Sequence, residues 1–291
     1  MSDEQWIMHT MAAAPTRRYP KQALTSHTTS AEKTTSTRPP CVRAVPAVSR
    51  GVAILRLLGR SSEPMGMKAI SDELDLVPST ALHILRVLVE EELVKVEPGT
   101  KRYRLGSGML SLARSVIESN NFASLSQPVL DRVAKKWGVS GMGVELTGGN
   151  HMVVVALSRS QAPFRLHVDV GSRFPILLSA TGRLVAAFGG DTWTQLEKKF
   201  KAVRWDKPVS MVTWRKEVEN ARRMGYSVDR NTYINGVTLV AVPLLDSDER
   251  ITHTLVAVGL SDHLNASLVR QLASDLREEA NKLARFLTPL R

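Results

Sequence analysis

Hydrophobic residues recur at helical spacing on two short neighbouring segments, and a tight turn separates these segments. The positions that carry the pattern are Ile70 and Leu74 in the first segment and Ala81, Ile84, Leu85 and Leu88 in the second. The turn Asp75-Leu76-Val77 is expected to bury Leu76 between the two helices. Pro78 suits the first turn of a helix, because its missing N–H has no partner there. The pattern predicts two packed helices, the second from Pro78 to about Glu91.

The other face of the second helix is polar and partly basic. It carries Ser79, Thr80, His83 and Arg86. Short hydroxyl groups and basic groups of this kind contact phosphates and base edges in the major groove of DNA. The layout is that of a helix-turn-helix with the second helix as recognition helix. Two packed amphipathic helices also occur in all-α domains that never bind DNA, and this stretch alone fits both interpretations.

A strand pair after the second helix favours DNA binding. Leu93–Val96 has the pattern of a strand, Pro98-Gly99 that of a turn, and Lys101–Leu105 that of a returning strand. Such a hairpin is the wing of a winged helix-turn-helix. Its tip and second strand carry Lys101, Arg102 and Arg104, which are placed to neutralise backbone phosphates.

The rest of the chain alternates between helical and strand patterns. Further helices are expected at 45–58, 106–121, 125–137, 181–188, 193–200, 214–224 and 264–286, and strands at 143–146, 151–158, 164–168, 227–231, 236–245 and 252–259. The helix at 106–121 carries an apolar stripe: Met109, Leu112, Ala113, Val116 and Ile117. Antiparallel strands with helices grouped around them indicate an α+β fold.

Several motifs together carry a resemblance to a known family. They are VSRGVAILRLL (48–58), STALHILRVL (79–88), KRYRLGSGMLSLA (101–113), FPILLSATGRLVAAF (174–188) and ARRMGYSVDRNTYINGVTLVAVPLLD (221–246). From about residue 44 to residue 290, the chain resembles IclR-type bacterial transcriptional regulators. One departure lies in the recognition helix, where Leu82-His83 replaces the family's more frequent His-Arg pair. The resemblance therefore implies DNA binding near Leu82 and His83, but not the operator sequence.

The resemblance implies four segments. They are a tail at 1–43, a winged helix-turn-helix at 44–105, a linker helix at 106–121 that takes part in a dimer contact, and a GAF-like effector-binding domain at 122–291. From the residues alone, the linker helix fits an ordinary domain-capping helix equally well. The resemblance also implies that small or aromatic acids bind against a loop and one sheet face. By position, the effector-binding residues would be Leu177, Ser179, Ala180, Thr181 and Gly182 on the loop, and Asp229, Leu239, Val256 and Val258 on the strands.

The loop itself suggests how an acid is held. Ser179-Ala180-Thr181-Gly182 precedes a helix, whose N-terminal N–H groups would receive a carboxylate. The apolar strand residues Leu239, Val256 and Val258 favour a larger, partly apolar ligand such as an aromatic acid. Equally, these strand residues would simply fill a core. If the loop binds a ligand, a bulky residue at Gly182 is expected to block it while leaving DNA binding intact.

Composition adds less than the pattern does. The net charge of +11 suits a polyanionic partner, yet residues 44–121 hold ten Lys and Arg against nine Asp and Glu. The tail is rich in Thr, Ser, Pro and Ala and is expected to be disordered. Cys41 is the single cysteine, which excludes an intrachain disulfide and fits a reducing cytoplasm. No apolar run is long enough to span a membrane.

The sequence lacks the motifs of an enzyme. Its seven histidines are scattered, and no paired metal ligands, nucleophile elbow or phosphate loop occur. Gly138, Gly141 and Gly143 follow a helix and enter a strand, so a turn is expected there and not a dinucleotide site. We therefore expect no enzyme activity, metal or cofactor.

The sequence predicts a homodimeric regulator, with a dimer of dimers implied by the resemblance. Its partners would be a double-stranded DNA operator and a small organic acid, with no membrane contact. The alternative is a constitutive or architectural DNA-binding protein without a ligand. Whether a metabolite changes operator affinity would distinguish the two.

Overall fold

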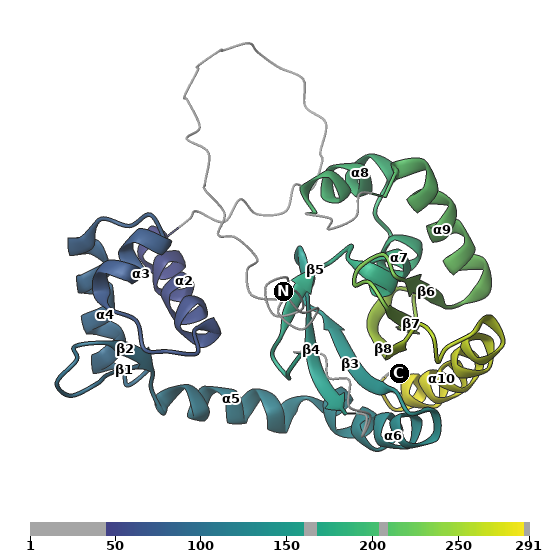
Figure 1. Cartoon of the computed structure of the whole chain (residues 1–291), viewed down its shortest axis with the longest axis horizontal. Coiled ribbons are helices and arrows are strands. Elements are labelled where there is room, and N and C mark those ends of the chain that lie inside the picture. Colours follow the sequence, from purple (N-terminus) through teal and green to yellow (C-terminus); the bar gives the residue numbers. More distant parts are fainter. Residues whose placement is uncertain (1–44, 160–167, 204–208, 288–291) are drawn as a thin grey trace, which may run out of the picture. The chain divides into compact units, whose positions relative to one another are not determined.

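The computed structural model describes residues 45–159, 168–203 and 209–287 (Figure 1), and of Ile117 only the backbone. The chain divides into two compact units, one ending at Ile117 and the other beginning at Glu118, so the boundary lies within helix α5 (Gly108–Ser119). The expected tail at 1–43 lies outside the described residues, and so does most of the strand expected at 164–168.

The first unit has the predicted order of elements. They are α2 (Pro46–Arg60), α3 (Met67–Glu73), α4 (Pro78–Glu90), β1 (Val94–Val96) and β2 (Tyr103–Leu105). Its core contains the fully buried Ile54, Ile70 and Leu85, one from each helix. Leu76 packs against this core but is only half-buried. The helical periodicity therefore identified the core-facing side of α3 and α4.

The turn between α3 and α4 is set by its backbone. Asp75 has a φ of 50°, in the left-handed region that Asp tolerates better than most residues. The N–H of Leu76 then donates to the carbonyl oxygen of Ser71 at 2.9 Å. The strand β2 pairs with β1, and Tyr103 also forms two backbone hydrogen bonds with Met65. The hairpin is thereby attached to the loop before α3.

The second unit is a six-stranded antiparallel sheet with helices on both faces (Figure 1). Its elements are α6 (Asn121–Trp137), β3 (Ser140–Leu146), β4 (His151–Ser158), β5 (Arg173–Pro175), α7 (Ser179–Phe188), α8 (Trp193–Ala202), α9 (Met211–Met224), β6 (Ser227–Arg230), β7 (Val237–Leu245), β8 (Ile251–Leu260) and α10 (Ala266–Leu287). The strand order is β5-β4-β3-β8-β7-β6. The α+β prediction is confirmed; β5 was missed.

Alternate residues of a strand contribute to two separate cores. On β8, Leu255 and Ala257 pack with α6 and α10, whereas Val256 and Val258 pack with α7 and α9. This division follows from the two-residue period of a strand. We call the cluster that contains Val256, Val258 and the buried apolar residues of α7 and α9 the α7-side core. The candidate ligand site depends on this core.

The glycines near the start of the sheet differ from the sequence expectation. Gly138 does end α6, with a φ of 65°, but Gly141 and Gly143 lie within β3 and not in a turn. A Cβ atom at Gly141 would approach the Cβ of Leu130 to 3.2 Å, and one at Gly143 would approach the Oγ of Ser126 to 3.1 Å. These two glycines therefore let α6 pack closely on β3.

Candidate functional sites

The polar face of α4 is open to a partner. Ala81, Leu85 and Leu88 turn into the core of the first unit. Opposite them Ser79, His83 and Arg86 are exposed, and Thr80 and Leu82 are half-buried. Within the described residues, neither His83 nor Arg86 forms an ion pair or a hydrogen bond. The structure thus presents the predicted DNA-binding face without a competing contact of its own.

The three basic wing residues are not equivalent. Lys101 and Arg102 are exposed at the hairpin, where Arg102 makes one long hydrogen bond of 3.5 Å to the carbonyl oxygen of Pro64. Arg104 lies on β2 with its Nε atom 3.8 Å from Oε1 of Glu97. Exposed pairs of this kind contribute little stability, but the nearby carboxylate offsets the charge of Arg104. Lys101 and Arg102 are therefore more available than Arg104 to an anionic partner.

The start of α7 is a buried helix end without a capping side chain. Its N-cap is Leu178, which offers no acceptor, and the first residues, Ser179, Ala180 and Thr181, are all buried. Among the described residues, no acceptor binds the N–H groups of these three residues. Ser179 is 5% exposed and its hydroxyl also lacks a partner there. Such a helix end carries a partial positive charge that an anion would stabilise.

Ser179 also has an unusual backbone conformation. Its φ is 56°, a left-handed value at the first residue of a helix. Serine has a Cβ atom and adopts this region less readily than glycine does. Backbone strain of this kind clusters at functional sites.

Most of the predicted effector-binding residues pack together. Leu177, Ala180, Leu239, Val256 and Val258 all belong to the α7-side core, and each is buried. The structure therefore brings the loop and strand residues together, and it places them as mutually packed side chains. Gly182 lies beside them, where its Cα faces the backbone of Leu177.

A buried hydroxyl pair joins α7 to the sheet. Oγ1 of Thr181 lies 3.3 Å from Oγ1 of Thr254 on β8, and both residues are buried. The sequence analysis did not include Thr254. Its position two residues before Val256, on the same face of the strand, was the available signal.

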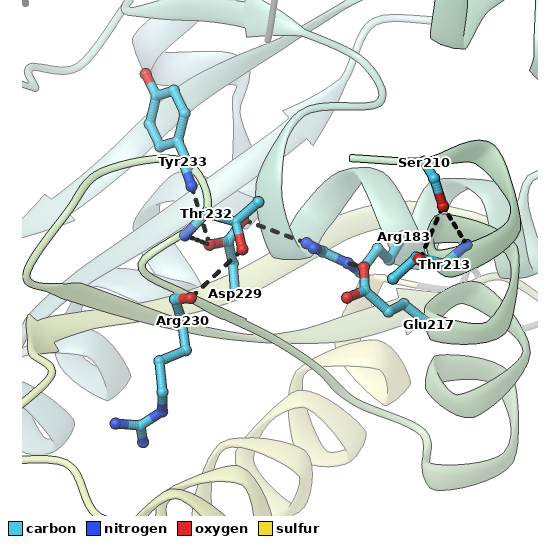
Figure 2. A network of polar contacts seen from close by, with 8 residues as sticks. All are labelled: Arg183, Ser210, Thr213, Glu217, Asp229, Arg230, Thr232 and Tyr233. Carbon is cyan, nitrogen blue, oxygen red and sulfur yellow. Dashed lines mark hydrogen bonds and ion pairs between the residues drawn. The ribbon is translucent and has the colours of Figure 1, made fainter. Parts of the chain in front are cut away.

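Both carboxylate oxygens of Asp229 accept hydrogen bonds from other groups of the chain. Its Oδ2 accepts a hydrogen bond from Nη1 of Arg183 at 3.2 Å, and its Oδ1 accepts from the N–H groups of Thr232 and Tyr233 at 3.1 and 3.2 Å. Arg183 and Asp229 are 2% and 1% exposed. Figure 2 shows Arg183 between Asp229 and Glu217, whose Oε2 lies 2.7 Å from its Nε. Asp229 thus lies next to the α7 start, and it holds the turn after β6.

A second polar cluster lies on the opposite face of the sheet. Asn120 accepts the N–H of Ala123 at 2.8 Å, which caps α6, and its Nδ2 donates to Glu145 at 2.9 Å. Glu145 is paired with His253 in the register of β3 and β8. The ring of His253 lies against Phe122, with 4.2 Å between centroids. No sequence pattern connected these residues, since they are far apart along the chain.

Burial at this cluster lowers the pKa of His253 below its ordinary value of 6.5, although Glu145 opposes the shift. The unfolded chain then binds the proton more readily than the folded one. We therefore expect His253 to reduce the free energy of unfolding as the pH falls below 6.5. Urea denaturation between pH 5 and pH 8 measures this, and His253→Gln should flatten the curve. His263→Gln, at an exposed histidine, is the control. Equal curves for the two variants would contradict the prediction.

Comparisons with known proteins agree over most of the chain. A model described as the IclR helix-turn-helix domain matches residues 47–98, and one described as the C-terminal part of the bacterial transcriptional regulator IclR matches residues 114–285. The transcriptional repressor AllR of Salmonella typhimurium is 25% identical over 252 residues, which cover 82% of this chain and 91% of AllR. AllR of Escherichia coli K12 is also 25% identical, over 248 residues, with the same coverage.

Solved structures agree in fold. An IclR transcriptional regulator from Alicyclobacillus acidocaldarius aligns with a TM-score of 0.74 and 22% identity, over 84% of this chain and 99% of the other. The Thermotoga maritima IclR aligns with a TM-score of 0.62 and 19% identity, over 82% and 98%. No helix in the described ranges has the length and apolar composition that crossing a membrane requires.

Proposed function

This chain belongs to the IclR family of bacterial transcriptional regulators, and from that premise we propose that a small organic acid controls its binding to a DNA operator. DNA binding follows from the family and its helix-turn-helix domain. We assign phosphate contacts to Ser79 and Thr80, at the N-terminus of α4. We assign base contacts to His83 and Arg86, with Leu82 beside them. The exposure of this face supports the assignment.

Removing a base contact is expected to relax sequence preference. His83→Ala or Arg86→Ala should weaken binding to the operator by about 1–3 kcal/mol while changing binding to scrambled DNA much less. The operator is first obtained by sequencing the DNA fragments that the purified protein retains. Titration of labelled operator and scrambled duplexes then measures both affinities.

The wing provides the matched control. Lys101→Ala/Arg102→Ala should weaken binding to both duplexes alike, and it should reduce the slope of log K against log salt by about 0.9 for each phosphate that is no longer neutralised. If His83→Ala and Arg86→Ala behave in the same way as the wing variant, they contact the backbone. If they have no effect, they lie outside the interface.

The buried start of α7 is the observation that carries the ligand proposal. A carboxylate would accept from the free N–H groups and the hydroxyl of Ser179. An aromatic body would lie against Leu239, Val256 and Val258, after some rearrangement of the packed core. Binding must favour one arrangement of the protein for the ligand to change operator affinity.

Calorimetry of the full-length protein with benzoate, 4-hydroxybenzoate, pyruvate and glyoxylate tests this proposal. We expect at least one acid to bind and to change operator affinity. Ser179→Ala should weaken that binding, whereas Ser126→Ala should not, because Ser126 is a buried serine whose hydroxyl is bound to the carbonyl of Ala123. If no acid binds or alters operator affinity, the protein is a constitutive DNA-binding protein instead.

We also propose that the regulator is a homodimer and that helix α5 forms part of the contact. Leu112 and Val116, on the predicted stripe, are 58% and 63% exposed, whereas a capping helix would bury them within the chain. Met109 is half-buried, and the side chain of Ile117 lies outside the described set. A dimer with two-fold symmetry matches an operator with two-fold symmetry, and a dimer of dimers would extend the contact along the DNA. Sedimentation showing only a 32.1 kDa species would contradict the proposal.

A further inference from the structure

The two edges of the sheet meet over the α7-side core. Phe174 lies on β5, which is one edge strand, and Tyr233 lies in the turn after β6, which is the other. Their rings nevertheless make an edge-to-face contact, with 6.5 Å between centroids and 82° between planes. Neighbouring strands lie about 4.8 Å apart, so a flat sheet of six strands would separate its edges by about 24 Å. The sheet and its turns must therefore curl around one face.

The face that they cover is the one with the candidate ligand site. Both Phe174 and Tyr233 are half-buried and pack against the α7-side core. Phe174 lies five positions before Ser179, so it leads directly into the buried start of α7. We propose that the Phe174–Tyr233 pair is the gate through which a ligand reaches the start of α7, and that it selects acids with an aromatic ring. This inference rests on the proposed ligand site.

Tyr233 is held in place from the inside of the domain. Its N–H donates to Oδ1 of Asp229, and Oδ2 of the same carboxylate binds Arg183 of α7, as Figure 2 shows. Arg183 lies one helical turn after Ser179. One carboxylate thus connects the gate to the helix whose first turn would bind the ligand. Arg183 and Asp229 are positioning residues for Tyr233.

The turn that carries Tyr233 is closed by a hydrogen bond between its two ends. Its first residue, Asn231, has a φ of 59°, and its last, Gly236, has a φ of 77°. The N–H of Gly236 donates to Oδ1 of Asn231 at 2.8 Å, which closes the turn on itself. Phe174 and Tyr233 contact each other edge to face and also pack against the α7-side core, and one ring pair is weak compared with the stability of a domain. The gate therefore opens at the ring contact, and the fold of the turn is preserved.

The edge-to-face contact also explains the ligand preference. Aromatic rings attract one another through a positive edge and a negative face. A ligand ring that enters between Phe174 and Tyr233 retains such contacts, whereas an aliphatic ring of similar size does not. The gate therefore favours a flat aromatic acid over its saturated counterpart.

Hydrogen exchange tests the gate without any ligand. In the full-length protein, Tyr233→Ala should increase exchange of the amides at 177–183 by about tenfold, because opening no longer requires breaking a ring pair. Tyr233→Phe, which keeps the ring, should show a clearly smaller increase than Tyr233→Ala. Phe188→Ala is the matched control, since Phe188 also packs half-buried against the α7-side core but at the other end of α7. Unchanged exchange in Tyr233→Ala, or an equal increase in Phe188→Ala, would overturn the gate.

Calorimetry with benzoate and cyclohexanecarboxylate tests the ligand preference. The wild type should bind benzoate more tightly, and Tyr233→Ala should lose about tenfold in benzoate affinity with little change for the saturated acid. Equal losses for both acids would overturn the aromatic selection. If only pyruvate or glyoxylate binds, and Tyr233→Ala binds it as the wild type does, the proposed acid site is supported and the proposed gate is contradicted. If no acid binds the wild type, the ligand proposal and this inference both fail.

Discussion

Asp229→Ala is expected to lower the free energy of unfolding of the second unit by about 3–5 kcal/mol, the range found when one partner of a buried ion pair is removed. Arg183 is 2% exposed and would keep a buried charge without its buried carboxylate. The N–H groups of Thr232 and Tyr233 would also lose their acceptor. Urea denaturation followed by circular dichroism measures the change in the transition of this unit.

Glu217→Ala is the matched control for this effect. Glu217 binds the same guanidinium but is 37% exposed, so its loss should reduce the free energy of unfolding by no more than about 1 kcal/mol. Replacing both buried partners, as Arg183→Met/Asp229→Leu, should recover much of the stability, because no buried charge then remains. A loss in Asp229→Ala no larger than that in Glu217→Ala would show that the buried pair is not a stabilising contact.

Gly182→Ala is expected to destabilise the second unit by about 3 kcal/mol or more. A Cβ atom at this position would lie 2.0 Å from both the carbonyl carbon and the carbonyl oxygen of Leu177. These are backbone atoms of the segment that enters α7, so they can move only if the start of the helix moves. Thermal denaturation of the full-length protein, followed by circular dichroism, measures the loss.

Gly149→Ala is the control, because a Cβ atom there would have no neighbour within 4 Å. It should change stability by less than about 0.5 kcal/mol. If Gly182→Ala is as stable as this control, the close approach to Leu177 is not a constraint. The expected clash also revises the sequence expectation. A bulky residue at Gly182 would disturb the folding of α7 before it blocked a ligand, so Ser179→Ala is the more selective test.

The periodic parts of the fold were predictable, and the irregular parts were not. The core-facing side of α4 followed from its helical spacing, and its start followed from Pro78. The strand β5 has three residues, too few for an alternating pattern, and was missed. The helix α6 begins at Asn121, earlier than the residue 125 expected from apolar spacing, because Asn120 caps it. Caps and short edge strands depend on contacts that a periodic pattern does not contain.

The candidate ligand site shows the same limit. Loop and strand residues such as Ala180 and Val256 were assigned to one site by the resemblance, and they do pack together. The pairing of Arg183 with Asp229 joins residues 46 positions apart and depends on how α7 lies beside β6. The sequence analysis assigned no role to Arg183. Its buried partner required the tertiary structure.

The uncapped start of α7 has a consequence for how such a regulator would change its ligand during evolution. The groups that we propose to bind the carboxylate are mainly backbone N–H groups, which every substitution except proline retains. The shape of the ligand body depends instead on side chains such as Leu239 and Val258, which a single mutation can replace. One part of the site is thus inherited with the fold, and the other is free to vary. New acids could then be recognised by successive changes on the strands without loss of the anchor for the carboxylate.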